Sequence, residues 1–525
     1  MIAIKILKEH INYYWKSSVL ILVLTTISNI LSIAYVYFFK NIIDNLVIDA
    51  PLRVTLKWVG IVFIILIINT GLSFFIYDFL LKRLKIEITT DLRSKFFSQY
   101  LLFPFSDIKK MTDGAIKSRI LEDTVSLSNY ISLYYFMLIG NTLRFVYTFF
   151  ALYQLDALVS LIVLLSVPLY YILSKHSLNK ISIYSQKERE NTDALYNSLE
   201  EKMNNIKTIK IYKAEKDIAH RFNKHLANWQ KSQNDIMFWN AIFTLIKDFL
   251  TSLLPIIIIT ISILRIKNNL MTIGALVATI SLLDAVYIPV DELLYFTSMK
   301  YSIAPIVERT KSFLNNATDL KKKEYNAVYA KGDYNSIHIE NLNFSYEPSH
   351  YIFKHFNFNV KGNGLYLIKG KNGCGKTTLF NIISGLQEIQ EGTVKINITE
   401  DFENKIVYMP QENEIFNDSV LNNITVYNTI LEAQSEIYKN IFPIEQPHKD
   451  VFAYSGGEER KISVMRLLSR NANIYLLDEP FENLDLQAKN QLKKILKELS
   501  SHAIVLFISH DNYFRDEELS IINID

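Results

Sequence analysis

Six long apolar runs in the first 300 residues constrain the fold of this 525-residue chain more than any other feature. They cover residues 18–39, 59–81, 131–155, 158–173, 238–264 and 270–290, and some are interrupted by single charges. A helix that crosses the hydrocarbon core of a bilayer needs about 20 apolar residues. The runs therefore predict an all-α domain of six transmembrane helices over residues 1–310, whereas a buried helical bundle in water would not need six near-spanning runs.

The charges between the runs predict their orientation. The long connections between the second and third runs and between the fourth and fifth runs are rich in Lys and Arg, while the other connections are short and carry few cations. By the positive-inside rule the long connections are cytoplasmic, which places both termini in the cytosol. Apolar positions keep a helical spacing over residues 187–222, so we expect helices that continue beyond the membrane rather than a solvated linker.

Two charged residues lie inside the predicted spans. Arg144 is near the middle of the third run, and Asp284 is about two-thirds of the way along the sixth. An ionisable side chain in hydrocarbon costs at least about 2.5 kcal/mol, so both should face a cavity or each other. We hypothesise that they line a polar translocation path; a structural ion pair is the alternative.

The second half of the chain has a different character. After a predicted linker over residues 311–333, residues 334–525 contain short apolar runs separated by Gly, Asn and charged turns, which predicts an α/β domain. The net charge of +3 gives no basis for a nucleic-acid binder, so no nucleic-acid partner is expected. The single Cys excludes a disulfide framework and a Cys-based zinc cluster.

Residues 370–377 match the pattern G-x-x-x-x-G-K-T between an apolar strand, 365–368, and a helix, 378–386. Backbone N–H groups of such a loop and the helix N-terminus bind phosphates. Lys376 is expected to reach the β- and γ-phosphates, and Thr377 to place its hydroxyl on Mg²⁺. The residues predicted to bind ATP in this segment are Gly370, Lys371, Asn372, Gly373, Cys374, Gly375, Lys376, Thr377 and Thr378.

Two more apolar strands end in polar residues. The strand 474–479 ends in Asp478, which is placed to hold Mg²⁺, and Glu479, which is the natural general base for the attacking water. The strand 503–508 is followed by Ser509 and His510. With the phosphate loop, these strand ends predict a site for ATP hydrolysis.

Residues 454–458, Tyr-Ser-Gly-Gly-Glu, resemble the signature motif of ATP-binding cassette (ABC) transporters. The resemblance implies that Ser455, Gly456, Gly457 and Glu458 contact the γ-phosphate of ATP bound to an opposing subunit. It also assigns Gln411 to the loop that senses Mg²⁺ and contacts the membrane domain, and Tyr346 to adenine stacking. Residues 483–485 resemble the D-loop, and His510 resembles the switch histidine that holds the γ-phosphate.

The whole layout is similar to half-size type IV ABC exporters: six spans, long intracellular helices and one cassette. Residues 112–123 resemble the first intracellular coupling region, and 205–216 the second. The resemblance implies ATP and Mg²⁺ as cofactors and an ATP hydrolase coupled to transport. It also implies that two chains sandwich two ATP molecules, with a homodimer favoured over a heterodimer. A peptide, a lipid or another amphipathic compound is the expected cargo.

The chain departs from the family pattern at several positions. The signature has Glu458 where Gln is usual and Tyr454 where Leu is usual, and the segment from Gln411 to Ser455 is short. None of these changes removes a catalytic group, so an active ATPase is expected. An ATP-binding regulatory or gating subunit that moves no substrate is the alternative, and ATPase activity stimulated by substrate would distinguish the two. An importer is disfavoured by the fused layout, and the abundance of Asn, Ile, Lys and Tyr suggests a bacterial plasma membrane.

Overall fold

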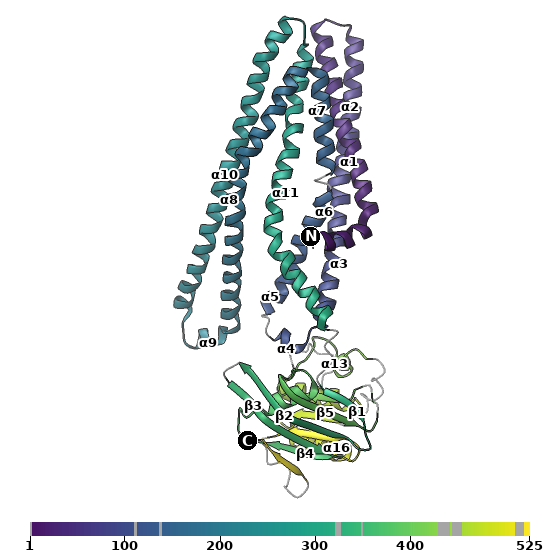
Figure 1. The fold of residues 1–525 in the computed structure, drawn as a ribbon, viewed down its shortest axis with the longest axis vertical. Coiled ribbons are helices and arrows are strands. Elements are labelled where there is room, and N and C mark those ends of the chain that lie inside the picture. Colours follow the sequence, from purple (N-terminus) through teal and green to yellow (C-terminus); the bar gives the residue numbers. More distant parts are fainter. Residues whose placement is uncertain are drawn as a thin grey trace. The chain divides into compact units, whose positions relative to one another are not determined.

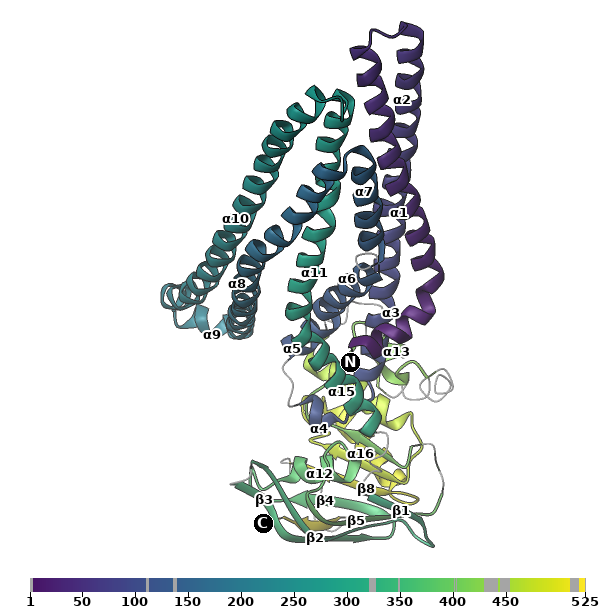
Figure 2. The same ribbon diagram turned by 45° about the horizontal axis from the view of Figure 1, so that its top comes forward.

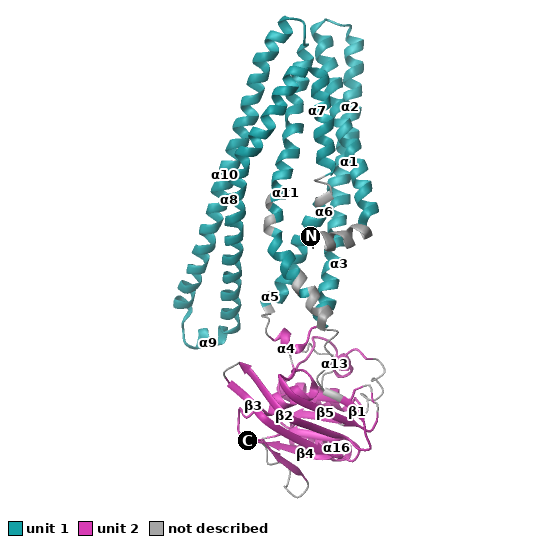
Figure 3. Ribbon diagram, in the orientation of Figure 1, with its two compact units in different colours: residues 1–102, 111–318 teal, residues 103–110, 319–525 magenta. Residues whose placement is uncertain are grey.

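The computed structural model describes residues 3–109, 113–135, 139–320, 327–347, 350–400, 402, 404–428, 442–443, 454–509 and 519–524. The chain divides into two compact units (Figure 3). Residues 1–102 and 111–318 form the first unit, and residues 103–110 and 319–525 form the second. The predicted linker, 311–333, contains regular structure, because a helix continues to Leu320 and a strand spans Ala327–Lys331.

The first unit is built from helices, of which α8, α10 and α11 extend well beyond the predicted apolar runs (Figure 1). They are α1 (Ala3–Val47), α2 (Leu52–Phe74), the π-helix η1 (Phe75–Leu81), α3 (Lys82–Tyr100), α5 (Asp113–Ser118), the π-helix η2 (Arg119–Asp123), α6 (Thr124–Tyr135), α7 (Asn141–Leu155), α8 (Ala157–Asn204), α9 (Ile206–Ile211), α10 (Glu215–Lys267) and α11 (Ile273–Leu320).

Five helices in the described part of the chain are long and apolar enough to cross a membrane. They contain residues 14–47, 52–100, 157–204, 215–267 and 273–297. The third predicted run, 131–155, falls on α6, on α7 and on residues 136–138, which lie outside the described residues. With 15 residues, α7 is too short to qualify alone.

Helices α8 and α10 lie side by side and are joined through α9 (Figures 1 and 2). Asp156 caps the start of α8, because its carboxylate accepts hydrogen bonds from the backbone N–H groups of Leu158 (2.9 Å) and Val159 (3.1 Å). The same carboxylate pairs with Arg265 in the last turn of α10. One buried acid thus ties the beginning of one long helix to the end of another.

Much of the apolar surface of the first unit is uncovered. Only 6% of the most apolar window of residues 52–100 is buried within the chain. Phe63 and Leu165 expose 62% and 66% of their surface. A surface of this kind is stable where lipid or another protein chain covers it.

The second unit contains two sheets. Five parallel strands are arranged in the order β6-β7-β8-β4-β9, and four strands form a second sheet in the order β1-β5-β2-β3. The strands are β1 (Ala327–Lys331), β2 (Ser336–Glu347), β3 (His350–Lys361), β4 (Gly364–Lys369), β5 (Glu391–Ile398), β6 (Ile406–Met409), β7 (Ile474–Asp478), β8 (Ile504–Ile508) and β9 (Ser520–Asn523). The helices are α4 (Phe105–Ile108), α12 (Lys376–Ser384), α13 (Val420–Thr425), α15 (Gly456–Leu468) and α16 (Leu486–Leu499).

The parallel sheet separates two apolar cores. Alternate residues of β7 point to opposite faces: Ile474 and Leu476 pack with α12 and the second sheet, whereas Tyr475 and Leu477 pack beneath α15 and α16. Because both faces are buried, the strand reads as one continuous apolar run in the sequence.

The strand register brings the functional segments to one edge. Asp478 is paired with Ile508, and Ile508 is paired with Ile368 on the other side. The carboxyl ends of β7, β8 and β4 are therefore level with one another. This is the edge of an open α/β sheet at which ligands bind.

Candidate functional site

The predicted phosphate loop, residues 370–377, follows β4 and opens α12. Gly373 and Gly375 have φ values of +84° and +100°, a region that favours glycine. Gly375 is the N-cap of α12, so the unbonded N–H groups of the first helical turn lie at the end of the loop. A glycine-rich loop that leads into a helix N-terminus is suited to binding phosphate.

The loop is closely packed on one side and open on the other. A Cβ atom on Gly370 would lie 2.3 Å from the backbone oxygen of Ile524 and 2.7 Å from the sulfur of Cys374, so only glycine fits. Cys374 is half-buried, whereas Lys371 and Asn372 are exposed at the tip of the loop. The close contacts fix the base of the loop and leave its tip accessible.

Lys376 folds back over its own loop. Its ammonium donates hydrogen bonds to the backbone oxygens of Gly370 (2.9 Å) and Lys371 (3.0 Å), and its side chain is buried. The next residue but one, Thr378, is also buried, and its hydroxyl oxygen lies 3.4 Å from that of Tyr346. The loop therefore carries a positive charge at the place where backbone N–H groups converge.

Thr377 and Asp478 are brought together from different elements. The Thr377 hydroxyl donates a hydrogen bond of 2.7 Å to the carboxylate of Asp478, which is 2% exposed. Hydroxyl and carboxylate oxygens are the ligands that Mg²⁺ takes from a protein, and its remaining positions are commonly filled by water and phosphate oxygens. The described residues contain no cluster of three or more His, Cys, Asp or Glu side chains that could hold a metal. The pair thus fits Mg²⁺ that is bound together with a nucleotide.

Glu479 adopts an unusual backbone conformation. Its φ of +50° is rare for a residue other than glycine, and such positions cost of order 1–3 kcal/mol. The Glu479 N–H donates a 3.0 Å hydrogen bond to the oxygen of Ile508, at the end of the neighbouring strand. The strain is therefore held by the sheet edge at which Asp478 lies. His510, the other residue predicted to act in hydrolysis, lies outside the described residues.

Tyr346 is half exposed near the end of β2, and its ring meets Phe344 edge-on at 5.0 Å between centroids. Lys109, directly after α4, places its ammonium 5.5 Å from the centroid of the same ring. Residues 103–110 belong to the same compact unit as these strands, although they are distant in sequence. Residues 113–123, the described part of the predicted first coupling region (112–123), belong to the first unit, and their coupling role stays a prediction.

The signature residues form the N-terminus of α15. Ser455 is the N-cap: its hydroxyl accepts from the Glu458 N–H (3.4 Å), and the Glu458 carboxylate accepts from the Ser455 N–H (2.8 Å). A capping box is formed by Glu or by Gln at this position, so Glu458 keeps the capping contacts that Gln would make. A Cβ atom on Gly457 would lie 2.7 Å from the backbone oxygen of Asn483, so the glycine lets the signature approach the predicted D-loop; Gly456 has more room.

Two features of this site could not be predicted by motif matching. Gln411 is exposed after β6, but its backbone oxygen accepts a hydrogen bond (3.0 Å) from Arg460, a buried arginine of α15 that no motif had indicated. The available signal was the spacing of Arg460, Val464 and Leu467, which places an arginine on the buried face of a predicted helix. The next residue of α15, Lys461, pairs with Asp485 of the predicted D-loop at 2.9 Å.

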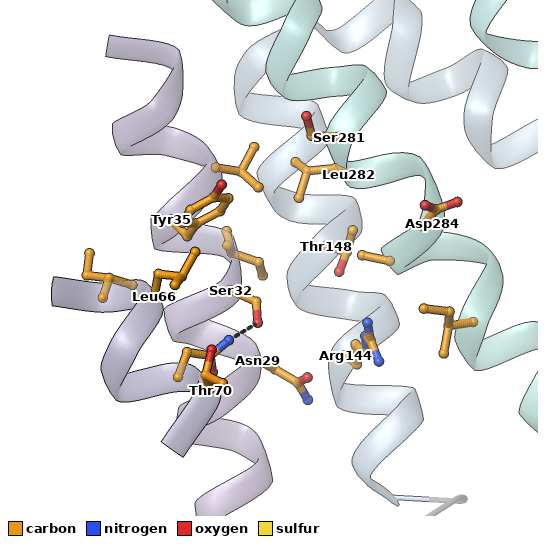
Figure 4. Close-up of a pocket in the computed structure, with 16 residues that line it drawn as sticks. Asn29, Ser32, Tyr35, Leu66, Thr70, Arg144, Thr148, Ser281, Leu282 and Asp284 are labelled. Atoms are coloured by element: carbon orange, nitrogen blue, oxygen red, sulfur yellow. Dashed lines mark hydrogen bonds between the residues drawn. The ribbon is translucent and has the colours of Figure 1, made fainter. Parts of the chain in front are cut away.

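The first unit contains a cavity of about 440 Å³, called the polar cavity here (Figure 4). It is lined by α1, α2, α7 and α11. Asn69 donates a 3.0 Å hydrogen bond to the hydroxyl of Ser32 across α1 and α2. The other polar lining residues are Asn29, Thr70, Arg144, Thr148, Ser281 and Asp284.

Arg144 and Asp284 both line the polar cavity, on the neighbouring helices α7 and α11 (Figure 4). Among the salt bridges between described residues there is none that joins them. By contrast, Lys247 and Asp291, on α10 and α11, do form a salt bridge, of 2.6 Å. The polar cavity therefore presents both signs of charge.

A second cavity of about 360 Å³, called the apolar cavity here, borders α7 and α11 on another face. Phe145 is adjacent in sequence to Arg144, and Pro289 is five residues after Asp284. Most other lining residues are apolar, among them Val167, Pro168, Tyr171, Val290 and Leu293. The same two helices thus carry a polar and an apolar cavity about one turn apart.

Family models match both halves of the chain. The model described as ABC transporter transmembrane region matches residues 18–290, and the model described as ABC transporter matches residues 353–482.

Individual proteins are similar over nearly the whole length. An ATP-dependent lipid A-core flippase of Desulfotalea psychrophila is 23% identical, over 91% of this chain and 86% of that protein. The flippase of the same name from Wigglesworthia glossinidia brevipalpis is 21% identical, over 90% and 84%. The solved structure of a bacterial Atm1-family ABC exporter with ATP bound superposes with a TM-score of 0.79 at 16% identity, covering 98% of this chain and 94% of that one. The structural likeness shows a shared fold.

Proposed function

Since the chain belongs to the ABC transporter family, whose two models together match its membrane half and its cassette, we propose that it is a half-size exporter that uses ATP to move an amphipathic molecule across a membrane. One observation carries the proposal: a single chain combines a phosphate loop beside the Thr377–Asp478 pair with a membrane half that contains a charged cavity. The family and these features make it an integral membrane ATPase coupled to transport.

In the proposed nucleotide site, the backbone of residues 370–377 and the first turn of α12 bind the phosphates. Lys376 exchanges the two loop carbonyls for the β- and γ-phosphates, which is a short movement for a flexible side chain. Tyr346 stacks on the adenine, and its half-exposed ring is accessible for that contact. Thr377 and Asp478, together with Gln411 as the family pattern implies, would hold Mg²⁺, which would supply charge neutralisation at the transferred phosphate.

Glu479 is proposed as the general base. Its carboxylate takes a proton from the attacking water, while its backbone stays fixed between the ends of β7 and β8. His510 is proposed to hold the γ-phosphate, following the family pattern. Neither role depends on a second metal.

Two chains, which we propose to be identical, complete each site. Ser455, Gly456, Gly457 and Glu458 of one chain would face the ATP bound to the other, so that ATP draws two cassettes together. Hydrolysis releases them, and the membrane helices follow if their inward and outward states differ in affinity for the closed cassettes. We place the protein in a bacterial plasma membrane with its cassette in the cytosol, as its loop charges favour.

The two cavities support an amphiphile as cargo. Arg144 and Asp284 make a polar lining that interacts favourably with a charged or hydrogen-bonding head group, because ionised groups at membrane depth require a polar partner. The apolar cavity on the same helices suits a hydrocarbon tail. Two of the similar proteins are named ATP-dependent lipid A-core flippases, which agrees with a lipid as cargo.

The test is transport by the purified full-length chain in liposomes of phosphatidylethanolamine and phosphatidylglycerol. ATPase activity and ATP-dependent movement of a fluorescent lipid are measured for the wild type, for Glu479→Gln and for Arg144→Gln. We expect Glu479→Gln to retain ATP without turnover, and Arg144→Gln to hydrolyse ATP but move less lipid.

The matched control is Arg83→Gln, which removes an exposed arginine paired with Glu87 outside the cavities. It should transport as the wild type does. ATP hydrolysis that no lipid or peptide stimulates, without ATP-dependent movement of either, would favour the regulatory subunit over the exporter.

A further inference from the structure

Arg460 is a fully buried charged residue that no role has yet explained. It lies in the second turn of α15, five residues after Ser455, and only 1% of its surface is exposed. Burial lowers the pKa of Arg460 from its ordinary value. A guanidinium nevertheless stays charged in a protein, so this side chain needs many acceptors to be stable here.

Those acceptors come from two functional segments. On one side, Nη1 donates to the backbone oxygens of Pro410 (3.1 Å) and Gln411 (3.0 Å) and to Oδ1 of Asn413 (3.1 Å). On the other side, Nη2 donates to the backbone oxygens of Asp478 (2.6 Å) and Glu479. One planar group therefore holds the loop after β6 and the end of β7 at a fixed separation.

The contact with Glu479 concerns its strained peptide. The Glu479 N–H is held by the oxygen of Ile508, and its carbonyl is held by Arg460. Because hydrogen bonds hold both the N–H and the carbonyl of Glu479, its φ stays at +50° and the backbone from which the carboxylate extends is fixed in position. The carbonyl also accepts a hydrogen bond from the Glu482 N–H (3.1 Å), three residues along the chain, so Arg460 is the contact that ties this carbonyl to another element. Removing Arg460 leaves the strained conformation with one support fewer.

We infer that Arg460 is a positioning residue that couples the signature helix α15 and the Gln411 loop to the backbone of the general base Glu479. The inference rests on the roles proposed above for Gln411 and Glu479. A shift of α15, produced when the signature engages the ATP of the other chain, would move the guanidinium and with it the Glu479 carbonyl. Arg460 would thereby make hydrolysis at one site depend on occupancy of the other.

The chemistry of arginine explains why this position would not accept a close substitute. The guanidinium offers five donors in a rigid plane. Here Nη1 donates to the loop at Gln411, and Nη2 donates to the end of β7 at Asp478. A lysine has one compact ammonium that can satisfy one segment at a time. Arg460→Lys keeps the charge but breaks the bridge.

The experiment compares Arg460→Lys with Arg466→Lys in the full-length chain in liposomes. Arg466 is the matched control, since it is a partly buried arginine of the same helix that donates to the oxygen of Asn423 (2.7 Å) and lies outside the proposed site. For each variant we measure kcat, KM for ATP, the Hill coefficient of ATP hydrolysis, the affinity for a fluorescent ATP analogue and the melting temperature.

We expect Arg460→Lys to lower kcat about tenfold or more while KM and analogue affinity change less than about threefold, a split that indicates a lost transition-state contact. The Hill coefficient should fall toward 1. Arg466→Lys should leave both kcat and the Hill coefficient near the wild-type values, even if it lowers the melting temperature.

A second variant keeps the inference testable if Arg460→Lys folds poorly. Asn413→Ala removes one of the three acceptors of Nη1 and leaves the two backbone oxygens, which is a smaller structural change, and it should also lower the Hill coefficient. Equal effects of Arg460→Lys and Arg466→Lys, or a Hill coefficient unchanged by Arg460→Lys and Asn413→Ala, would overturn the inference while leaving the proposed exporter intact. A wild-type chain without ATPase activity would overturn both.

Discussion

The substitution Gly375→Ala tests whether the phosphate loop works through its close packing on β3. At φ +100° an alanine is strained, and its Cβ would lie 2.6 Å from Cγ2 of Ile352 and 2.8 Å from Cζ of Phe353. A left-handed backbone costs a non-glycine residue about 1–2 kcal/mol. Forcing an extra methyl group into a packed site costs about 1–3 kcal/mol more.

Gly362→Ala separates the two contributions. Gly362 has φ +85°, but nothing lies within 4 Å of an added Cβ, so only the backbone strain applies. The difference between the variants is the packing term, and about 1–3 kcal/mol corresponds to about 5- to 150-fold in an equilibrium constant. If the clash is relieved by moving the loop away from β3, the N-terminus of α12 moves with it and ATP affinity falls by that factor.

The assay is titration of each full-length variant with a fluorescent ATP analogue and Mg²⁺, together with its melting temperature. Gly375→Ala should bind the analogue more weakly than Gly362→Ala, or melt at a lower temperature if the strand yields instead. The reasoning is refuted if the two variants are the same in both measurements.

Three other predictions concern stability, pH and the metal. Asp156→Ala removes both the cap of α8 and a buried ion pair, which should lower the free energy of unfolding by about 2–5 kcal/mol. The melting temperature in detergent should fall by several degrees while ATP affinity stays unchanged, and an unaltered melting curve would contradict this. The hydrogen bond from the Ala488 N–H, together with Lys461, holds the pKa of Asp485 below its ordinary value. The contribution of Asp485 to stability is therefore present above the ordinary pKa and is lost as the pH falls through the lowered pKa. Asp485→Asn should flatten the acidic part of a stability–pH curve, and an unchanged slope would contradict this prediction. Chelation of Mg²⁺ should abolish ATPase activity, and Thr377→Ala should raise the Mg²⁺ concentration needed for half-maximal activity about tenfold; equal Mg²⁺ requirements in the variant and the wild type would exclude Thr377 as a ligand.

Local sequence patterns predicted the nucleotide segments well. The phosphate loop lies between a strand and a helix as expected, and α12 begins at Lys376, two residues before the predicted start, because Gly375 caps it. The strand before Asp478 is fully buried and ends at that residue. These features depend on glycine conformations and on apolar strands with both faces buried, which are local in origin.

Longer-range features were harder to predict. The third apolar run divides between α6 and α7 in the described structure, although its composition resembles that of the other runs. Nothing in the sequence indicated that residues 103–110, which include α4 (Phe105–Ile108), belong to the same compact unit as the cassette strands. Composition sets the preference for lipid, but contacts between segments distant in sequence decide which compact unit a short segment joins.

By itself the sequence determined the two halves of this protein, its six apolar runs, and the residues of the phosphate loop and the signature, since each follows from composition or from short spacing along the chain. Only the tertiary structure decided that Arg144 and Asp284 share a cavity without forming a pair, and that Arg460 joins the loop at Gln411 to Glu479. Both depend on distances between side chains and backbone groups far apart in sequence. Such distances are fixed by the packing of whole helices and strands, which no local pattern records.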